Sequence, residues 1–283
     1  MQNQPQKVGN TPAEIFRHGR EAETAGRFAE AREAYEAGLQ ASPRQHPWQY
    51  RLGCVLMKMG HVRDAEEIFR RALELAPGTE AYLTNLAVTL DRQGRRDEAI
   101  RFYRRAIHEG ARSPVAYHNL GAIYAEEGRV SEAIGAFEAA IALEPDADGY
   151  HNLGLVHYAG NDFARALGCF EEAVVHAPDF AMGHYYAGLC LMKSGLYRDA
   201  IRKFEQAQGL NPNLSRSRYH VGVCLHKLEQ YDRARDSLER ALEVFPEDGR
   251  IHYQLALTCD ALGLPQEARL HYSQARAARA RGG

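Results

Sequence analysis

A small residue, glycine or alanine, returns every 33 or 34 residues along the chain. It occupies positions Gly19, Gly53, Ala87, Gly121, Gly154, Gly188, Gly222 and Ala256. An alanine follows each of these positions after 12 residues, and an aromatic residue or leucine follows after four more, from Tyr35 to Tyr272. A fixed period of this length indicates a repeat architecture, in which each unit packs only on its neighbours. We therefore expect eight repeats and no single central core.

Each repeat is predicted to form two short amphipathic helices. Within residues 115–145, an apolar face of helical spacing is followed, after a break at Gly128, by a second one. The first face contains Tyr117, Leu120, Gly121 and Tyr124, and the second contains Val130, Ala133, Ile134, Phe137, Ala140 and Ile141. The small residue lets the two helices cross closely, and the aromatic residue fills the space beside the crossing.

The boundaries of the helices also have sequence signals. Prolines, which end a helix, close six of the eight units at Pro43, Pro77, Pro145, Pro178, Pro212 and Pro246. The loop glycine is replaced by Glu229 in the seventh unit, and Asn161, which tolerates a left-handed backbone, follows Gly160 in the fifth. Thr11 to Glu14 has the spacing of a capping box with proline at the first helical position, so the first helix is expected to begin there.

These columns resemble the tetratricopeptide repeat, whose pattern is met by Tyr117, Leu120, Gly121, Tyr124, Ala133, Phe137 and Pro145. The resemblance implies an all-α, right-handed α-solenoid superhelix of tandem helix-turn-helix units. It predicts a flexible arm at residues 1–11 and one array over residues 12–283. The predicted repeats are 12–45, 46–79, 80–113, 114–146, 147–180, 181–214, 215–248 and 249–283.

Composition excludes several classes of protein. The 35 Lys and Arg residues nearly balance 37 Asp and Glu, and both signs are interleaved, which argues against nucleic-acid binding. No apolar stretch approaches the roughly 20 residues that span a bilayer, so membrane insertion is not expected. The polar first ten residues lack the apolar region of a secretory signal, and five cysteines without a C-x-x-C pair favour a reducing, cytoplasmic setting.

No motif for catalysis, nucleotide binding or a cofactor is present, so an enzyme is not expected. His118 and His151 occupy equivalent places in adjacent repeats, which would set them about 8–10 Å apart, one helix spacing. That separation is too wide for a shared metal ion. Both are therefore predicted to be surface or groove histidines.

An asparagine precedes the Leu-Gly or Leu-Ala pair in three consecutive repeats, at Asn85, Asn119 and Asn152. In the family, this column of the first helices faces the concave wall. A carboxamide offers two donors and an acceptor, which match a peptide group, and rungs about 10 Å apart would meet every third residue of an extended chain. The arrangement resembles the asparagine ladder of the O-linked N-acetylglucosamine transferase superhelix. The alternative is that each asparagine bonds only to a neighbouring helix.

Other residues predicted to face this groove would select the partner. The basic and aromatic ones are Arg17, Arg20, Tyr50, Arg51, Lys58, Arg92, His118, His151, Tyr158, Tyr185, Tyr186, Lys193, Tyr219, His220, Lys227 and Tyr253. The acidic ones are Asp91, Glu126, Asp148 and Asp260. Such a wall would complement an extended or helical segment of another protein that carries acidic residues and one or two apolar anchors.

The sequence thus predicts a non-enzymatic adaptor or scaffold that binds a peptide segment of another protein. Two alternatives stay open, a self-associating structural scaffold and the regulatory arm of a separate enzyme such as a glycosyltransferase. Arg276 stands where the other repeats carry an apolar residue that covers the next unit. We therefore expect the array to end there, with the arginine-rich last turns as a solvated cap.

Overall fold

The computed structural model describes residues 11–110 and 112–281, and this part of the chain contains sixteen helices and no strand. It divides into two compact units, residues 1–144 (unit 1) and 145–283 (unit 2). Most of the predicted arm, residues 1–10, lies outside the described residues. The all-α solenoid of helix pairs predicted from the period is confirmed.

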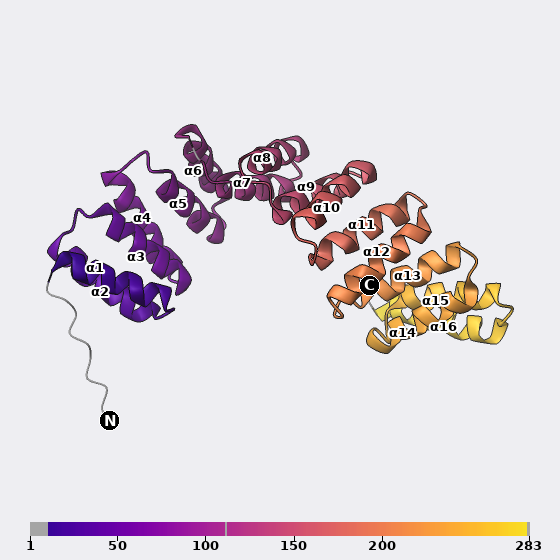
Figure 1. The fold of residues 1–283 in the computed structure, drawn as a ribbon. Helices are drawn as coiled ribbons and strands as arrows, with labels where there is room; N and C mark the ends of the chain where they lie inside the picture. The colour runs from indigo at the N-terminus through magenta and orange to yellow at the C-terminus, as the bar shows by residue number, and fades with distance from the viewer. Residues whose placement is uncertain (1–10, 111, 282–283) are drawn as a thin grey trace, which may run out of the picture. The chain divides into compact units, whose positions relative to one another are not determined.

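Unit 1 contains α1 (Pro12–Thr24), α2 (Phe28–Ala41), α3 (His46–Lys58), α4 (Val62–Leu75), α5 (Glu80–Arg92), α6 (Arg96–His108), α7 (Val115–Glu126) and α8 (Val130–Leu143). Unit 2 contains α9 (Ala147–Ala159), α10 (Phe163–His176), α11 (Ala181–Lys193), α12 (Tyr197–Leu210), α13 (Arg216–Lys227), α14 (Tyr231–Val244), α15 (Gly249–Ala261) and α16 (Pro265–Arg281). These helices are labelled along the chain in Figure 1.

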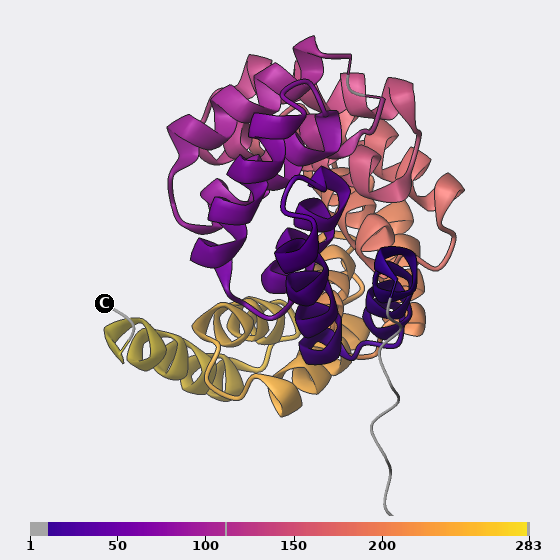
Figure 2. The same cartoon turned by 90° about the vertical axis from the view of Figure 1, so that its left-hand side faces the viewer.

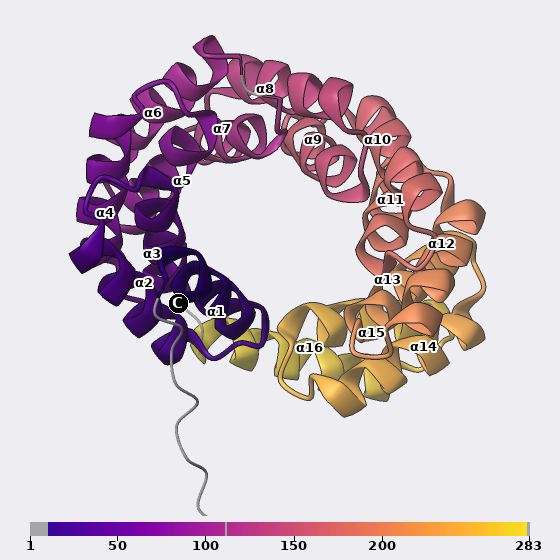
Figure 3. The same cartoon turned by 60° about the vertical axis from the view of Figure 1, so that its left-hand side comes forward.

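Each unit is a double layer of helices. The two helices of every repeat pack against each other, and each second helix packs on the first helix of the next repeat in the same unit. Successive first helices also contact one another, α3 with α5 and α5 with α7 in unit 1, and α11 with α13 and α13 with α15 in unit 2. In Figure 3 the odd-numbered helices accordingly lie on the inner side of each unit, and the even-numbered helices lie outside them.

The predicted close crossing of the two helices in a repeat is confirmed. A methyl group placed on Gly121 would lie 2.9 Å from the ring of Phe137, and one on Gly154 would lie 2.7 Å from the ring of Phe170. These two rings are almost fully buried. The glycines therefore allow a helix approach that a side chain would block.

The helix boundaries follow the sequence signals. Six second helices end two residues before their proline, as α4 does at Leu75 before Pro77. Between the two helices of the fifth and seventh repeats the backbone is left-handed, with φ of 61° at Asn161 and 60° at Glu229. Thr11 and Glu14 form the predicted capping box at the start of α1.

Where the aromatic column contains tyrosine, the residue 12 positions earlier is acidic. The Tyr35 hydroxyl donates to Glu23 at 3.2 Å, and the Tyr272 hydroxyl donates to Asp260 at 2.8 Å. Asp91 has the same relation to Tyr103 and raises the pKa of its hydroxyl, although burial is the larger cause. The repeats with phenylalanine or leucine in this column have Met57, Ala125, Tyr158, Met192 or His226 at the acid position. In each of the three repeats the tyrosine hydroxyl thus lies near an acid 12 residues earlier, and two of the three tyrosines, Tyr35 and Tyr103, are buried.

Candidate functional site

Asn85 and Asn119, the first two predicted rungs, lie on α5 and α7, two first helices of unit 1. The Asn85 amide donates to the Tyr50 hydroxyl at 3.2 Å and to the Ala81 carbonyl at 2.8 Å. The Asn119 side chain is hydrogen-bonded to the Tyr103 hydroxyl. Both amides therefore bond within their own unit. Asn85 uses its side-chain nitrogen for both of its bonds.

Arg51 and Lys58, predicted to face the groove, converge on one carboxylate. Glu23 of α1 lies 3.6 Å from the Arg51 guanidinium and 3.2 Å from the Lys58 ammonium, and its side chain is 9% exposed. With the Tyr35 bond, this carboxylate has three partners. These two ion pairs join α3 to α1, so both cations already have an acidic partner within unit 1. Glu23 was not among the predicted residues, although its position 12 residues before Tyr35 marks it in the sequence.

Other predicted cations have no such partner. Arg92, Lys193 and Lys227 occupy the same repeat position as Lys58, in the last turn of a first helix. All three are exposed, and none makes an ion pair with any residue that the structure describes. At this repeat position, the unpaired positive charge of the described residues therefore lies in the third, sixth and seventh repeats.

His151 of unit 2 lies within a group of aromatic rings. Its ring centroid is 5.5 Å from Phe170, 5.1 Å from Phe180 and 5.3 Å from Tyr186. Burial lowers the pKa of its imidazole. The ring thus packs between α9, α10 and α11. His118, the equivalent residue of unit 1, packs on Phe137 at 6.2 Å.

His220 and Tyr185 extend the ring packing to the next repeat. The His220 ring stacks on Phe204 with centroids 5.2 Å apart, and its Nε2 lies 3.1 Å from the Tyr185 hydroxyl. Burial, followed by the charges of Arg216, Arg250 and Lys193, lowers the pKa of His220 to about 4. This imidazole is therefore neutral at pH 7 and joins α13 to α11.

The remaining predicted residues of unit 2 differ in the contacts that their side chains make. Tyr186 stacks on Phe170 at 5.2 Å, and Tyr158 contacts Tyr186 edge-on at 6.0 Å, so both form part of the ring packing. Asn152 is half-buried and makes no side-chain hydrogen bond to any residue within the described ranges. Asn85 and Asn119, the other two predicted rungs, do make such bonds.

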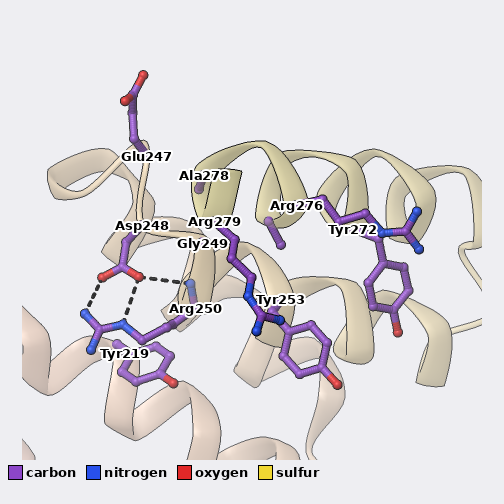
Figure 4. A pocket seen from close by; sticks show the side chains of 11 residues that line it. Tyr219, Glu247, Asp248, Gly249, Arg250, Tyr253, Tyr272, Arg276, Ala278 and Arg279 are labelled. Carbon is purple, nitrogen blue, oxygen red and sulfur yellow. Dashed lines mark hydrogen bonds and ion pairs between the residues drawn. The ribbon is translucent and has the colours of Figure 1, made fainter. Parts of the chain in front are cut away.

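A pocket of ≈ 820 Å³ lies at the C-terminal end of unit 2 (Figure 4). We call it the C-terminal pocket. It is lined by Tyr219, Glu247, Asp248, Gly249, Arg250, Tyr253, Tyr272, Ala275, Arg276, Ala278 and Arg279. Tyr219 comes from α13, and the others come from the turn before α15, from α15 and from α16. Of these residues only Tyr219 and Tyr253 were predicted to face a groove, and Arg276 was interpreted as a cap.

The described residues hold neither a metal-binding cluster nor a membrane-spanning helix. Residues 11–110 and 112–281 contain no group of three His, Cys, Asp or Glu side chains placed to hold a metal ion. Within the same residues no helix is long and apolar enough to cross a bilayer.

Family patterns match most of the chain. The tetratricopeptide repeat pattern matches residues 16–53, 50–114, 114–147, 147–180 and 216–281. The pattern of subunit 3 of the anaphase-promoting complex, or cyclosome, matches residues 166–241. No curated protein matches the chain significantly.

Several solved structures are similar. YrrB, described as a tetratricopeptide repeat protein with an unusual peptide-binding site, is 23% identical over 64% of this chain and 94% of its own, with a TM-score of 0.59. MamA from MSR-1 is 27% identical over 60% of this chain and 98% of its own, with a TM-score of 0.53. The C-terminal part of a repeat protein from Cytophaga hutchinsonii is 15% identical over 85% and 99%, with a TM-score of 0.70.

Proposed function

The chain belongs to the tetratricopeptide repeat family, and on that premise we propose that it is a non-enzymatic adaptor that binds a peptide segment of a partner protein on its inner face. The family and its similar structures support a protein-interaction scaffold. We place it in the reducing setting of the cytoplasm, where the five cysteines, all free thiols in the structure, are stable.

One observation carries the choice of ligand. Exposed cations without acidic partners among the described residues lie on first helices at Arg92, Lys193 and Lys227, and the first helix α9 carries Asn152. Cations attract the carboxylates of a partner, and the amide pairs with its backbone. The similarity to YrrB, which has a peptide-binding site, supports the same ligand class.

The proposal is tested with the segment of a co-purifying partner, mapped by cross-linking and made as a synthetic peptide. We expect N119A/N152A to weaken its binding more than tenfold in calorimetry, with unchanged helicity by circular dichroism. Q206A/Q266A, which removes two exposed amides from second helices, is the matched control. Unaltered affinity of N119A/N152A would remove the asparagines from the binding site.

Self-association is the competing function, and mass in solution distinguishes the two. A self-assembling scaffold grows in mass as protein concentration rises, whereas an adaptor keeps one mass until its partner is added. Sedimentation over a hundredfold range of concentration therefore decides between them.

A further inference from the structure

The C-terminal pocket has acidic groups that are already occupied. Asp248 accepts three hydrogen bonds from Arg250, two from the guanidinium at 2.7 and 3.1 Å and one from the backbone N–H at 2.9 Å. Glu247 pairs with Arg281 at 3.1 Å, and Asp260 accepts the Tyr272 hydroxyl. These contacts neutralise the two carboxylates of the lining.

Two cations of the lining have no such partner. Arg276 and Arg279 are exposed and make no ion pair with any residue in the described part of the chain. They are three positions apart on α16 and therefore share one helical face. Figure 4 shows Arg279 pointing from α16 toward Tyr253 on α15. The pocket thus presents positive charge without a counter-charge.

Three tyrosines line the pocket and, with Ala275 and Ala278, form its apolar part. Tyr253 is 53% exposed, although it is one of the largest apolar side chains of unit 2. Its ring lies 6.0 Å from that of Tyr272, and Tyr219 lines the same pocket from α13. Exposed rings beside arginines are typical of binding surfaces.

The backbone that forms the pocket is closely packed. A methyl group on Gly249 would lie 3.0 Å from the Ala278 side chain and 3.2 Å from the Ala275 carbonyl, so α15 begins directly against α16. Helix α16 has 17 residues, against 13 or 14 for the other second helices, and its last turns carry Arg276 and Arg279. Figure 2 shows this last helix of the chain in yellow. The volume of the pocket falls within the range of about 300–1,000 Å³ found for ligand sites.

We propose that the C-terminal pocket binds an acidic segment of the partner protein. Two carboxylates of the segment pair with Arg276 and Arg279, and an apolar or aromatic side chain between them packs on Tyr253 and its neighbours. This assignment rests on the proposed function and names the part of the molecule that recognises the partner.

The test uses the full-length protein and a fluorescein-labelled peptide of four Glu-Glu-Phe repeats, with a Lys-Lys-Phe peptide for comparison. We expect fluorescence anisotropy to show binding of the acidic peptide alone, and at least tenfold weaker binding by R276E/R279E. The milder R276Q/R279Q should bind the acidic peptide about threefold more weakly, or weaker still. R198E/R269E reverses two exposed charges of unit 2 outside the pocket and should change the affinity less than twofold.

The aromatic contribution has its own variants. Y253A should lower the affinity for the acidic peptide about fivefold. Y253F should bind the peptide as tightly as the parent does, because the face of the ring makes the contact. Equal binding by the parent, R276E/R279E and R276Q/R279Q would overturn the assignment. So would tighter binding of single-stranded oligonucleotide than of peptide, or a dimer that dissociates in R276E/R279E, since the occupant would then be a nucleic acid or a second copy.

The mapped partner segment separates this proposal from the proposed function. If N119A/N152A weakens binding of that segment and R276E/R279E does not, the pocket assignment fails and the adaptor function stands. If R276E/R279E alone weakens this binding, the pocket is the recognition site and the asparagines are not part of that site. If neither variant weakens it, both assignments fail.

Discussion

The residue before the Leu-Gly pair has different chemistry in the two units. In the third and fourth repeats of unit 1 it is Asn85 or Asn119, whose amides bond to tyrosine hydroxyls. In the sixth and seventh repeats of unit 2 it is Tyr186 or His220, whose rings stack on Phe170 and Phe204. The same backbone position therefore joins neighbouring elements by hydrogen bonds in these two repeats of unit 1 and by ring packing in these two repeats of unit 2.

The difference affects how the units respond to acid. Burial lowers the pKa of His151, His220, His226 and His271, and all four belong to unit 2. A buried imidazole must lose its packing or accept an unfavourable charge when the pH falls. Ring packing thus makes the stability of unit 2 dependent on pH.

The largest expected effect comes from removing a ring beneath this packing. F170A should lower the free energy of unfolding by about 3–5 kcal/mol. F69A is the equivalent change in unit 1, and its loss of unfolding free energy should be smaller by about 1 kcal/mol. Phe170 packs on two further rings, those of His151 and Tyr186. Among the aromatic rings of the described residues, Phe69 contacts that of Tyr50 alone. Urea unfolding followed by circular dichroism measures both. Equal costs would mean that the ring packing adds nothing to burial.

Acid should destabilise unit 2 next. The folded pKa of His220, about 4, is below its ordinary value of 6.5, so its contribution is complete above pH 6.5 and is lost as the pH falls toward 4. The loss is about 3 kcal/mol for this group. Ellipticity should therefore fall before the fluorescence of Trp48, the single tryptophan, which reports on unit 1.

H220F, which keeps a ring on Phe204, is the control for the acid titration. It should shift the loss of ellipticity to lower pH. Simultaneous change of both signals in the parent protein would show that the two units respond to acid alike.

A smaller effect is expected at the carboxylate that joins α1 to α3. E23Q keeps the shape of the side chain but removes the charge that Arg51 and Lys58 share, and it should cost about 1–2 kcal/mol. E21Q changes an exposed glutamate 3.9 Å from Arg17 and should cost less than about 0.5 kcal/mol. Trp48 fluorescence during urea unfolding follows both variants. A cost for E23Q no greater than that for E21Q would mean that the contact contributes nothing.

The smallest effect should come from Asn85. N85A removes hydrogen bonds to Tyr50 and Ala81 and should lower the stability of unit 1 by about 1 kcal/mol. Binding of the partner segment should change less than twofold, because the amide nitrogen is already engaged within the unit. A tenfold loss of affinity at full stability would instead make Asn85 a rung like Asn152.

The period predicted the parts of the fold that depend on backbone geometry. The crossing of Gly154 against Phe170, the capping box at Thr11 and the left-handed residue at Asn161 each require a residue type at one place. Such requirements are visible in a single sequence because few residues meet them.

The partners of long side chains were not predictable in this way. The period places Lys58 and Lys193 at one repeat position, yet Lys58 reaches Glu23, and Lys193 makes no ion pair within the described ranges. Whether the lysine at this position forms an ion pair depends on the residue 35 positions earlier, which lies on another helix. The C-terminal pocket was missed for a similar reason, since it forms only where α15 and α16 bring Tyr253 and Arg279 together.

The pairing of tyrosine with an acid twelve residues earlier limits how these repeats can be recombined. A chimaera that joins the first helix of the fourth repeat to the second helix of the first would place Tyr35 opposite Ala125 in place of Glu23. The phenol would then be enclosed with no acceptor, a penalty of about 1–3 kcal/mol. Inheritance and protein engineering can therefore exchange whole helix pairs of this chain more readily than single helices.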